Sequence, residues 1–317
     1  MSIDRISTSA QTAFLLTQIQ NAGNQLDKVQ EQIASGKNAD TYAGFGDKAQ
    51  VLTATISANA RNDAYTDATK FAVTQTDLQD TQLTSLASLV TDLKKAVSDA
   101  VANNDATTLM DKAQSIFDQA SAILNSKDSN GDYIYSGGKT DVPPITVGAL
   151  SGLTGLGSVS QAFANGNLKK SVQVADGVTV SYGVTASDVA TGLMQTLKDI
   201  ADFDASGSGN FNSATSLTAA QSGFLTNTIG QATTVYTNLN AATAANGYVS
   251  NRLTDAQTQQ TSMTTLYKQF TSDIQDTNMA NAATQLSLNQ TQLQAALQVT
   301  AGLHQLSLLN YLPINGQ

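Results

Sequence analysis

The first apolar pattern of the chain lies near its N-terminus, in residues 3–34. Apolar side chains there are spaced alternately three and four positions apart, and Gln, Asn, Asp and Lys fill most other positions; the apolar set is Leu15, Ile19, Ala22, Leu26, Val29 and Ile33. A repeat of about 3.5 residues is typical of a helix that pairs with other helices. Gly36 follows as a natural left-handed helix cap. We therefore predict a long helix, followed by a loop over residues 37–46.

The same spacing recurs in three further segments. It predicts a helix over residues 48–103, which is long for a globular protein and ordinary for a rod, and a shorter helix over residues 106–125. At the other end, helix is expected from residue 217 to residue 310, with one weak point at Asn246-Gly247. An apolar seam near the C-terminus contains Ala296, Val299, Leu303 and Leu306.

The middle of the chain has a different composition, which is rich in Gly, Val and Tyr over residues 126–185. Apolar residues alternate with polar ones on both sides of Asp176-Gly177, which predicts a β-hairpin over residues 172–182. Residues 187–202 are expected to form a short helix and residues 203–216 a flexible loop. Residues 146–170 lack a strong apolar pattern, so a surface position that tolerates replacement is expected for them.

These patterns predict a mainly α fold, in which long N- and C-terminal coiled-coil helices form an α-helical rod and a small mixed or β domain is inserted in the middle. Five segments are expected: an N-terminal assembly helix and loop (1–47), the N-terminal part of the rod (48–125), a variable exposed middle domain with the hairpin (126–216), the C-terminal part of the rod (217–270), and a C-terminal assembly helix (271–317). Periodicity alone leaves open whether the terminal seams pair within one chain or between chains.

Composition narrows the classes of function. Only 13% of the residues are charged, the net charge is −9, and Cys and Trp are absent. A negative chain without clustered Lys and Arg argues against nucleic acid and against an anionic membrane surface. The sequence has no run of about 18 apolar residues, so we expect no membrane insertion. Its N-terminus lacks the order of basic, apolar and small residues that marks a cleaved signal peptide.

The candidate chemical motifs are all incomplete. His304 has neither a Cys nor a second His with which to form a metal site or a catalytic triad. Residues 35–37 and 136–139 end in Gly-Lys but lack the upstream glycine of a phosphate-binding loop. Residues 128–132 look faintly like a calcium loop but have no closing Glu, so a turn is expected. We expect no catalytic residue, no cofactor, no metal site and no enzyme activity.

Three short motifs carry a resemblance to a known family. Residues 26–37 (LDKVQEQIASGK) run a seam into Ser-Gly-Lys, residues 249–253 contain Asn-Arg-Leu, and residues 272–280 read SDIQDTNMA. In this order, and at these distances from both ends, the motifs resemble those of the flagellin superfamily. The resemblance covers residues 1–125 and 217–312, and the middle of the chain is variable, as the family implies.

Two further segments indicate a branch of that family. Residues 306–312 (LSLLNYL) and 133–144 (YIYSGGKTDVPP) resemble the hook–filament junction branch, in which Leu-Phe stands in place of Ile134-Tyr135. Residues 313–317 extend beyond the expected ending. A filament-forming flagellin therefore remains an alternative. A cell-surface flagellin-like adhesin and a hydrolase with an unrecognised site are hypotheses from other classes.

The resemblance implies a structural subunit of the bacterial flagellum that polymerises through its terminal helices. It implies that residues 3–34 meet residues 275–312 in an assembly interface of Leu15, Ile19, Leu26, Val29, Ile33, Ala296, Val299, Leu303, Leu306 and Leu309. The implied partners are other copies of the chain, other flagellar axial proteins (hook-associated proteins and flagellin), the flagellar export apparatus and an export chaperone. The implied location is the extracellular flagellum, reached by secretion without a cleaved signal peptide.

Overall fold

The computed structural model describes the backbone of residues 3–309 and the side chains of residues 10–302. Its α-helices are α1 (Ile3–Ser35), α2 (Ala49–Asn103), α3 (Leu109–Leu124), α4 (Ala186–Ala205), α5 (Ala219–Gln275) and α6 (Met279–Leu309), and its strands are β1 (Lys170–Ala175) and β2 (Val178–Tyr182). Short 3-10 helices are η1 (Tyr42–Lys48), η2 (Leu150–Leu153), η3 (Val159–Ala162) and η4 (Phe211–Ser213). The prediction of a mainly α chain with a small mixed insertion is confirmed.

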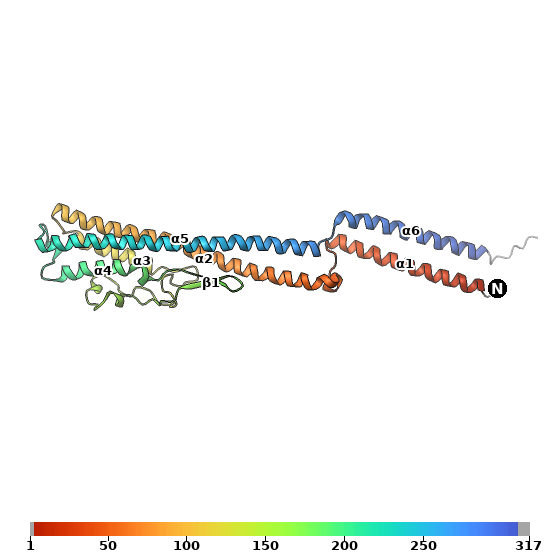
Figure 1. Cartoon of the computed structure of the whole chain (residues 1–317), viewed down its shortest axis with the longest axis horizontal. Coiled ribbons are helices and arrows are strands. Elements are labelled where there is room, and N and C mark those ends of the chain that lie inside the picture. Colours follow the sequence, from red (N-terminus) through yellow and green to blue (C-terminus); the bar gives the residue numbers. More distant parts are fainter. Residues whose placement is uncertain (1–2, 310–317) are drawn as a thin grey trace, which may run out of the picture. The chain divides into compact units, whose positions relative to one another are not determined.

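The chain divides into two compact units, and Figure 1 labels the helices that build them. Unit 1 combines the stretch up to Arg61 with the stretch from Met263 onward, so it holds α1, α6 and one end each of α2 and α5. Unit 2 runs from Asn62 to Ser262 and holds the rest.

Unit 2 contains the main hydrophobic core. The seam predicted on α2 is buried there, with Leu83, Leu93 and Val97 inaccessible to solvent. It packs with apolar residues of α3, α4 and α5, and Tyr135, Phe117 and Phe211 are among the largest side chains that are fully buried. A Thr185–Asp188 capping box begins α4, because each side chain accepts a hydrogen bond from the other residue's backbone N–H.

The predicted hairpin is confirmed as an antiparallel pair of β1 and β2. Val172 pairs with Val180, and Gly177 adopts a φ of +72° in the turn, a conformation that favours glycine. The inward side chains of the hairpin, among them Val174 and Tyr182, are buried with Ala72 of α2 and Leu253 of α5. The hairpin therefore fastens onto the two long helices of unit 2.

Residues 146–170 differ from their predicted surface position. Four of their side chains lie in the main core, namely Leu150, Leu153, Val159 and Ala162. They belong to the 3-10 turns η2 and η3, which offer too few residues for a periodic apolar pattern to show. Replacing this segment by a Gly/Ser linker would remove core side chains, so the expected tolerance is wrong for these four positions.

At Asn246-Gly247, the predicted weak point of the helix, α5 runs on without a break. Asn246 is buried, and its side-chain amide donates a hydrogen bond to the carbonyl oxygen of Thr76 on α2 at 2.9 Å. This contact holds in place an asparagine that would otherwise favour a turn. The helix ends instead at Gln275, and α6 begins at Met279.

Candidate assembly surface

The helices α1 and α6 pair with each other inside unit 1 and lie side by side in Figure 1. Among the described side chains of the two helices, only Val29, Ala282 and Asn289 are buried. The other predicted interface residues of α1, namely Leu15, Ile19, Leu26 and Ile33, are half-buried. On α6, Ala296 is half-buried and Val299 is 54% exposed.

Large apolar side chains are therefore left open to solvent on this pair. Phe14 is 62% exposed and Leu16 is 51% exposed on α1, and Leu288 is 55% exposed on α6. Each helix of a pair buries only one face of the other. The remaining apolar surface therefore either packs against another partner or stays exposed to solvent. Leu303, Leu306 and Leu309 of the predicted interface, and also His304, lie outside the described side chains.

A junction of backbone and side-chain hydrogen bonds joins the end of α1 to the break between α5 and α6. Asn38 is its centre. The backbone N–H of Asn38 donates to the carbonyl oxygen of Gln275 at 2.8 Å. Its side-chain amide donates to the carbonyl oxygens of Ile274 at 3.0 Å and Asp276 at 2.9 Å. Asn38 thus satisfies carbonyl groups that the end of a helix leaves without an intrahelical partner.

A second set of contacts completes the junction. The backbone N–H of Thr277 donates to the carbonyl oxygen of Gly36 at 2.9 Å, and Lys37 and Asp276 form an antiparallel bridge. Gly36 has a φ of +71°, which only glycine adopts readily. The side-chain oxygen of Asn278 accepts from the backbone N–H of Asn281 and so caps the start of α6. The path of the chain into α6 is therefore fixed from both sides.

Sequence reasoning found the two segments of this junction but not their contact. Residues 26–37 and 272–280 carry the family resemblance, and the fold brings them together across more than two hundred residues. The role of Asn38 was missed. The available signal was the run Asp276-Thr277-Asn278, because Asp and Asn favour helix caps and turns over helix interiors.

One pair of carboxyl groups lies close to the junction. Hydrogen bonding to the Asp40 side chain, followed by the charge of Asp40, raises the pKa of Glu31 above its usual value. Both side chains are exposed to solvent, so this interaction is screened and contributes little to stability.

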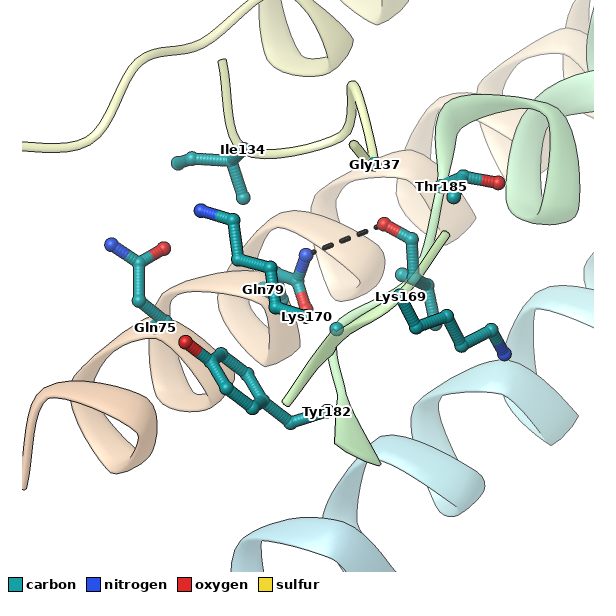
Figure 2. Close-up of a pocket in the computed structure, with 10 residues that line it drawn as sticks. Gln75, Gln79, Ile134, Gly137, Lys169, Lys170, Tyr182 and Thr185 are labelled. Atoms are coloured by element: carbon teal, nitrogen blue, oxygen red, sulfur yellow. Dashed lines mark hydrogen bonds between the residues drawn. The ribbon is translucent and has the colours of Figure 1, made fainter. Parts of the chain in front are cut away.

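A small pocket of unit 2 is another place where polar side chains converge (Figure 2). The Gln79 side chain points into it and donates to the carbonyl oxygen of Val184 at 3.5 Å. The two lysines of the pocket are paired: Lys169 with Asp188 at 3.8 Å, and Lys170 with Asp128 at 3.6 Å. The cavity measures about 10 Å³, which is on the order of one water molecule and far below the volume of a ligand site.

Asp128 organises the chain around this pocket. Its carboxylate is 1% exposed, and it accepts hydrogen bonds from the backbone N–H groups of Asn130 and Asp132 and from the Gln75 side chain. These contacts make residues 128–132 a turn, as predicted. Within the described residues, no group of three His, Cys, Asp or Glu side chains could hold a metal ion. The hydrogen bonds and the ion pair around the pocket therefore hold the turn and the hairpin against α2.

Across the part of the chain that the structure describes, none of the helices combines the length and the apolar character needed to cross a membrane.

Comparison with known proteins places the chain near flagellar components. Residues 228–312 match the model of the bacterial flagellin C-terminal helical region. Over 145 residues the chain is 26% identical to flagellar hook-associated protein 3 of Salmonella typhimurium, and this alignment covers 44% of the chain and 46% of that protein. Over 146 residues it is 25% identical to the protein of the same name from Escherichia coli, covering 45% and 46%. The chain thus matches just under half the length of these relatives.

Solved structures extend the likeness of the fold. A putative flagellar hook-associated protein from Vibrio parahaemolyticus superposes with a TM-score of 0.60 at 17% identity, over 72% of this chain and 97% of that one. FlgL from Bacillus cereus superposes with a TM-score of 0.51 at 13% identity, over 69% and 98%. The resemblance to the flagellin superfamily drawn from the sequence motifs is confirmed: residues 228–312 match the bacterial flagellin C-terminal helical region, and the chain is similar to flagellar hook-associated protein 3.

Proposed function

We propose that this chain is a structural subunit of the bacterial flagellum, located at the junction between hook and filament. The observation that carries the proposal is the α1–α6 pair, which leaves large apolar side chains exposed in a chain similar to flagellar hook-associated protein 3. The proposed role is mechanical. The subunit joins two kinds of axial protein and performs no catalytic turnover.

The assembly surface of this proposal is the terminal pair. Its residues are Leu15, Ile19, Leu26, Val29, Ile33, Ala296, Val299, Leu303, Leu306 and Leu309. Burying the exposed apolar groups of the pair releases about 25 cal/mol per Å² of apolar surface. Ordering the terminal segments costs roughly 1–2 kcal/mol per residue for the backbone. Neighbouring subunits shift the balance between apolar burial and ordering cost toward the folded helices, because they cover faces that a single pair leaves exposed to solvent.

The partners follow from this role. We infer that the chain assembles with copies of itself, with other hook-associated proteins and with flagellin. We also infer that it reaches the extracellular flagellum through the flagellar export apparatus, accompanied by an export chaperone. The low proportion of charged residues, 13% of the chain, and the absence of Cys suit a chain that is threaded in an unfolded state.

A filament-forming flagellin is the second candidate. The match of residues 228–312 to the flagellin C-terminal helical region is compatible with this role as well as with the first, because that region alone does not separate the two. Both candidates use the same terminal pair, and they differ in position along the flagellum.

A clean deletion of the gene, examined by electron microscopy, separates the two candidates. A junction subunit predicts hooks without filaments, with flagellin released into the medium. A filament subunit predicts hooks that carry normal or shortened filaments. Restoration by the wild-type gene, but not by Ile19→Asp, would support assembly through the terminal pair. Normal flagella and normal swimming in the deletion strain would contradict both candidates.

A further inference from the structure

The sequence contains Asn-Gly pairs at residues 130–131, 165–166, 246–247 and 315–316. In such a pair the backbone nitrogen of the glycine can attack the side-chain amide carbon of the asparagine, because glycine has no Cβ to shield its nitrogen. The reaction needs a free asparagine side chain and a backbone that can turn toward it. The last pair lies outside the described residues, and the fold holds the other three to very different degrees.

The pair at residues 246–247 is held inside α5. Asn246 is buried, and its side-chain amide donates a hydrogen bond to the carbonyl oxygen of Thr76. Gly247 lies in the middle of the helix, where its backbone N–H takes part in the regular helical hydrogen bonds. Attack would require the helix to unwind and the buried amide to leave its partner.

The next pair lies in a loop, but its groups are also fixed. The Asn165 amide nitrogen donates to the Ser187 hydroxyl at 2.9 Å, and its oxygen accepts from the Ser187 backbone N–H at 3.3 Å. The backbone N–H of Gly166, which would be the nucleophile, donates to the carbonyl oxygen of Ser136 at 2.8 Å. A Cβ placed on Gly137 would lie 2.5 Å from the Gly166 carbonyl oxygen, so two backbone segments pack closely here. Gly166 is therefore held away from the reaction.

The pair at residues 130–131 is open by comparison. Both residues are exposed, and the Asn130 side chain makes no hydrogen bond within the part of the chain that the structure describes. Beyond the two neighbours of Gly131, no atom lies within 4 Å of the place that a Cβ would occupy, so there is room beside its nitrogen. The Gly131 N–H donates to the carbonyl oxygen of Asp128 at 3.0 Å, and this turn contact must break before the attack.

We propose that Asn130 is a site of spontaneous modification, at which an exposed turn converts asparagine to aspartate or isoaspartate while the fold protects Asn165 and Asn246. The Gly131 nitrogen loses its proton and bonds to Cγ of Asn130, the bond from Cγ to Nδ2 breaks, and Nδ2 leaves as ammonia. Water then opens the cyclic imide. Opening at Cγ gives aspartate, and opening at the backbone carbonyl carbon gives isoaspartate. The net change is the addition of water and the loss of ammonia, and the inference does not rest on the proposed function.

The modification would act on the turn that Asp128 organises. The backbone N–H groups of Asn130 and Asp132 donate to the Asp128 carboxylate at 2.9 and 3.1 Å. Isoaspartate adds one main-chain atom between these two N–H groups, so they no longer match a single carboxylate. Either product also adds a negative charge beside Asp128, which pairs with Lys170 of the hairpin at 3.6 Å. The hairpin should therefore be held less firmly after modification.

The test follows the purified full-length chain during incubation, in buffer and in guanidinium chloride. Mass spectrometry of its peptides measures each Asn-Gly pair separately, and an isoaspartate methyltransferase labels the isoaspartate product. In the folded chain we expect modification of Asn130 to be at least about ten-fold faster than that of Asn165 or Asn246, because those sites must first open locally. In denaturant the three rates should converge. The rate at Asn130 should rise with pH, because the glycine nitrogen must lose its proton.

Asn130→Gln is the matched control variant, because glutamine keeps an exposed amide but would have to close a larger ring. It should give no product at this position. Its denaturation midpoint should stay constant during incubation, whereas the midpoint of the wild type should fall as the product accumulates.

Several outcomes would overturn the inference. Equal rates at Asn130 and Asn165 in the folded chain would show that the fold does not select the site. Product at Asn130 in denaturant but none in buffer would show that the turn protects this pair as well. A rate that does not change with pH would exclude attack by the glycine nitrogen. An equal fall of the midpoint in Asn130→Gln would refute the effect on the hairpin.

Discussion

The terminal pair of unit 1 and the core of unit 2 differ in how far their apolar side chains are buried, although both are built from helices with a similar spacing of apolar residues. In unit 2 the α2 seam is closed by three other helices, and side chains as large as Phe117 and Tyr135 are fully buried. In the α1–α6 pair the same kind of seam leaves Leu15 and Ile19 half-exposed. A heptad pattern thus shows that a helix has partners, but not whether those partners belong to the same chain.

The largest expected effect tests this contrast with one substitution made in each region. Phe211 is fully buried and stacks on Phe203 with ring centroids 5.5 Å apart, whereas Phe14 is 62% exposed. Phe211→Ala should lower the free energy of unfolding by about 3–5 kcal/mol, because it leaves a cavity. Phe14→Ala should change it by less than about 0.5 kcal/mol. Urea denaturation of the free chain measures both values.

Similar losses for the two phenylalanine variants would break the contrast. They would mean that the terminal pair is as firmly closed in the free chain as the core of unit 2. A smaller loss for Phe211→Ala, on the order of 1 kcal/mol, would mean that the core collapses around the missing ring.

A second prediction concerns the buried carboxylate of unit 2. Asp128→Asn keeps an oxygen for the turn but removes the charge that Lys170 faces at 3.6 Å. The new amide NH₂ group also faces hydrogen-bond donors that contact the carboxylate in the wild type, such as the side chain of Gln75. We expect a loss of about 1–3 kcal/mol in the free energy of unfolding. Asp141→Asn, at an exposed position of the same insertion, is the control and should be silent in the same denaturation experiment.

The third prediction concerns the junction in unit 1. Asn38→Ala removes the side-chain hydrogen bonds to the carbonyl oxygens of Ile274 and Asp276. The local cost should be about 1–2 kcal/mol, since each such bond contributes roughly 0.5–1.5 kcal/mol. Hydrogen exchange should then accelerate about ten-fold at the backbone N–H of Thr277. Asn24→Ala, exposed on α1, should leave that exchange unchanged, and equal rates in both variants would assign the junction no stabilising role.

The helices and the hairpin could be predicted because their signals are local. The spacing of Leu83, Leu93 and Val97 and the alternation around Asp176-Gly177 depend on neighbouring residues only. The contacts of Asn38 and Asn246 could not, because each joins residues far apart in the sequence, and nothing near either asparagine indicates its partner.

The candidate surface was predicted only in part, for a related reason. The seam positions follow from periodicity, and the structure leaves Leu26 and Ile33 half-buried on the paired helix α1. On α6, Val299 was predicted as part of the seam, whereas Leu288 was not, and the exposure of both side chains could not be read from their spacing. The absence of charge in the same helix was readable from the sequence, but it gains its meaning only from the exposed side chains of the pair.

The smallest expected effect concerns a buried hydroxyl in unit 2. Tyr135 is fully buried, and its hydroxyl has no hydrogen-bond partner among the described residues. Tyr135→Phe should therefore be neutral or stabilise the chain by up to about 1 kcal/mol at pH 7.

Burial also raises the pKa of Tyr135, so the folded state holds this proton more tightly than the unfolded state. The resulting stability is fully present below pH 10, the usual pKa of tyrosine, and is lost as the pH rises toward the folded-state pKa. Urea unfolding at pH 7 and at about pH 10.5 should show a smaller alkaline loss in Tyr135→Phe than in the wild type. Some loss should remain, because burial and the charge of Asp128 also raise the pKa of Tyr182. An equal alkaline loss in both chains would mean that the Tyr135 hydroxyl is hydrated in solution.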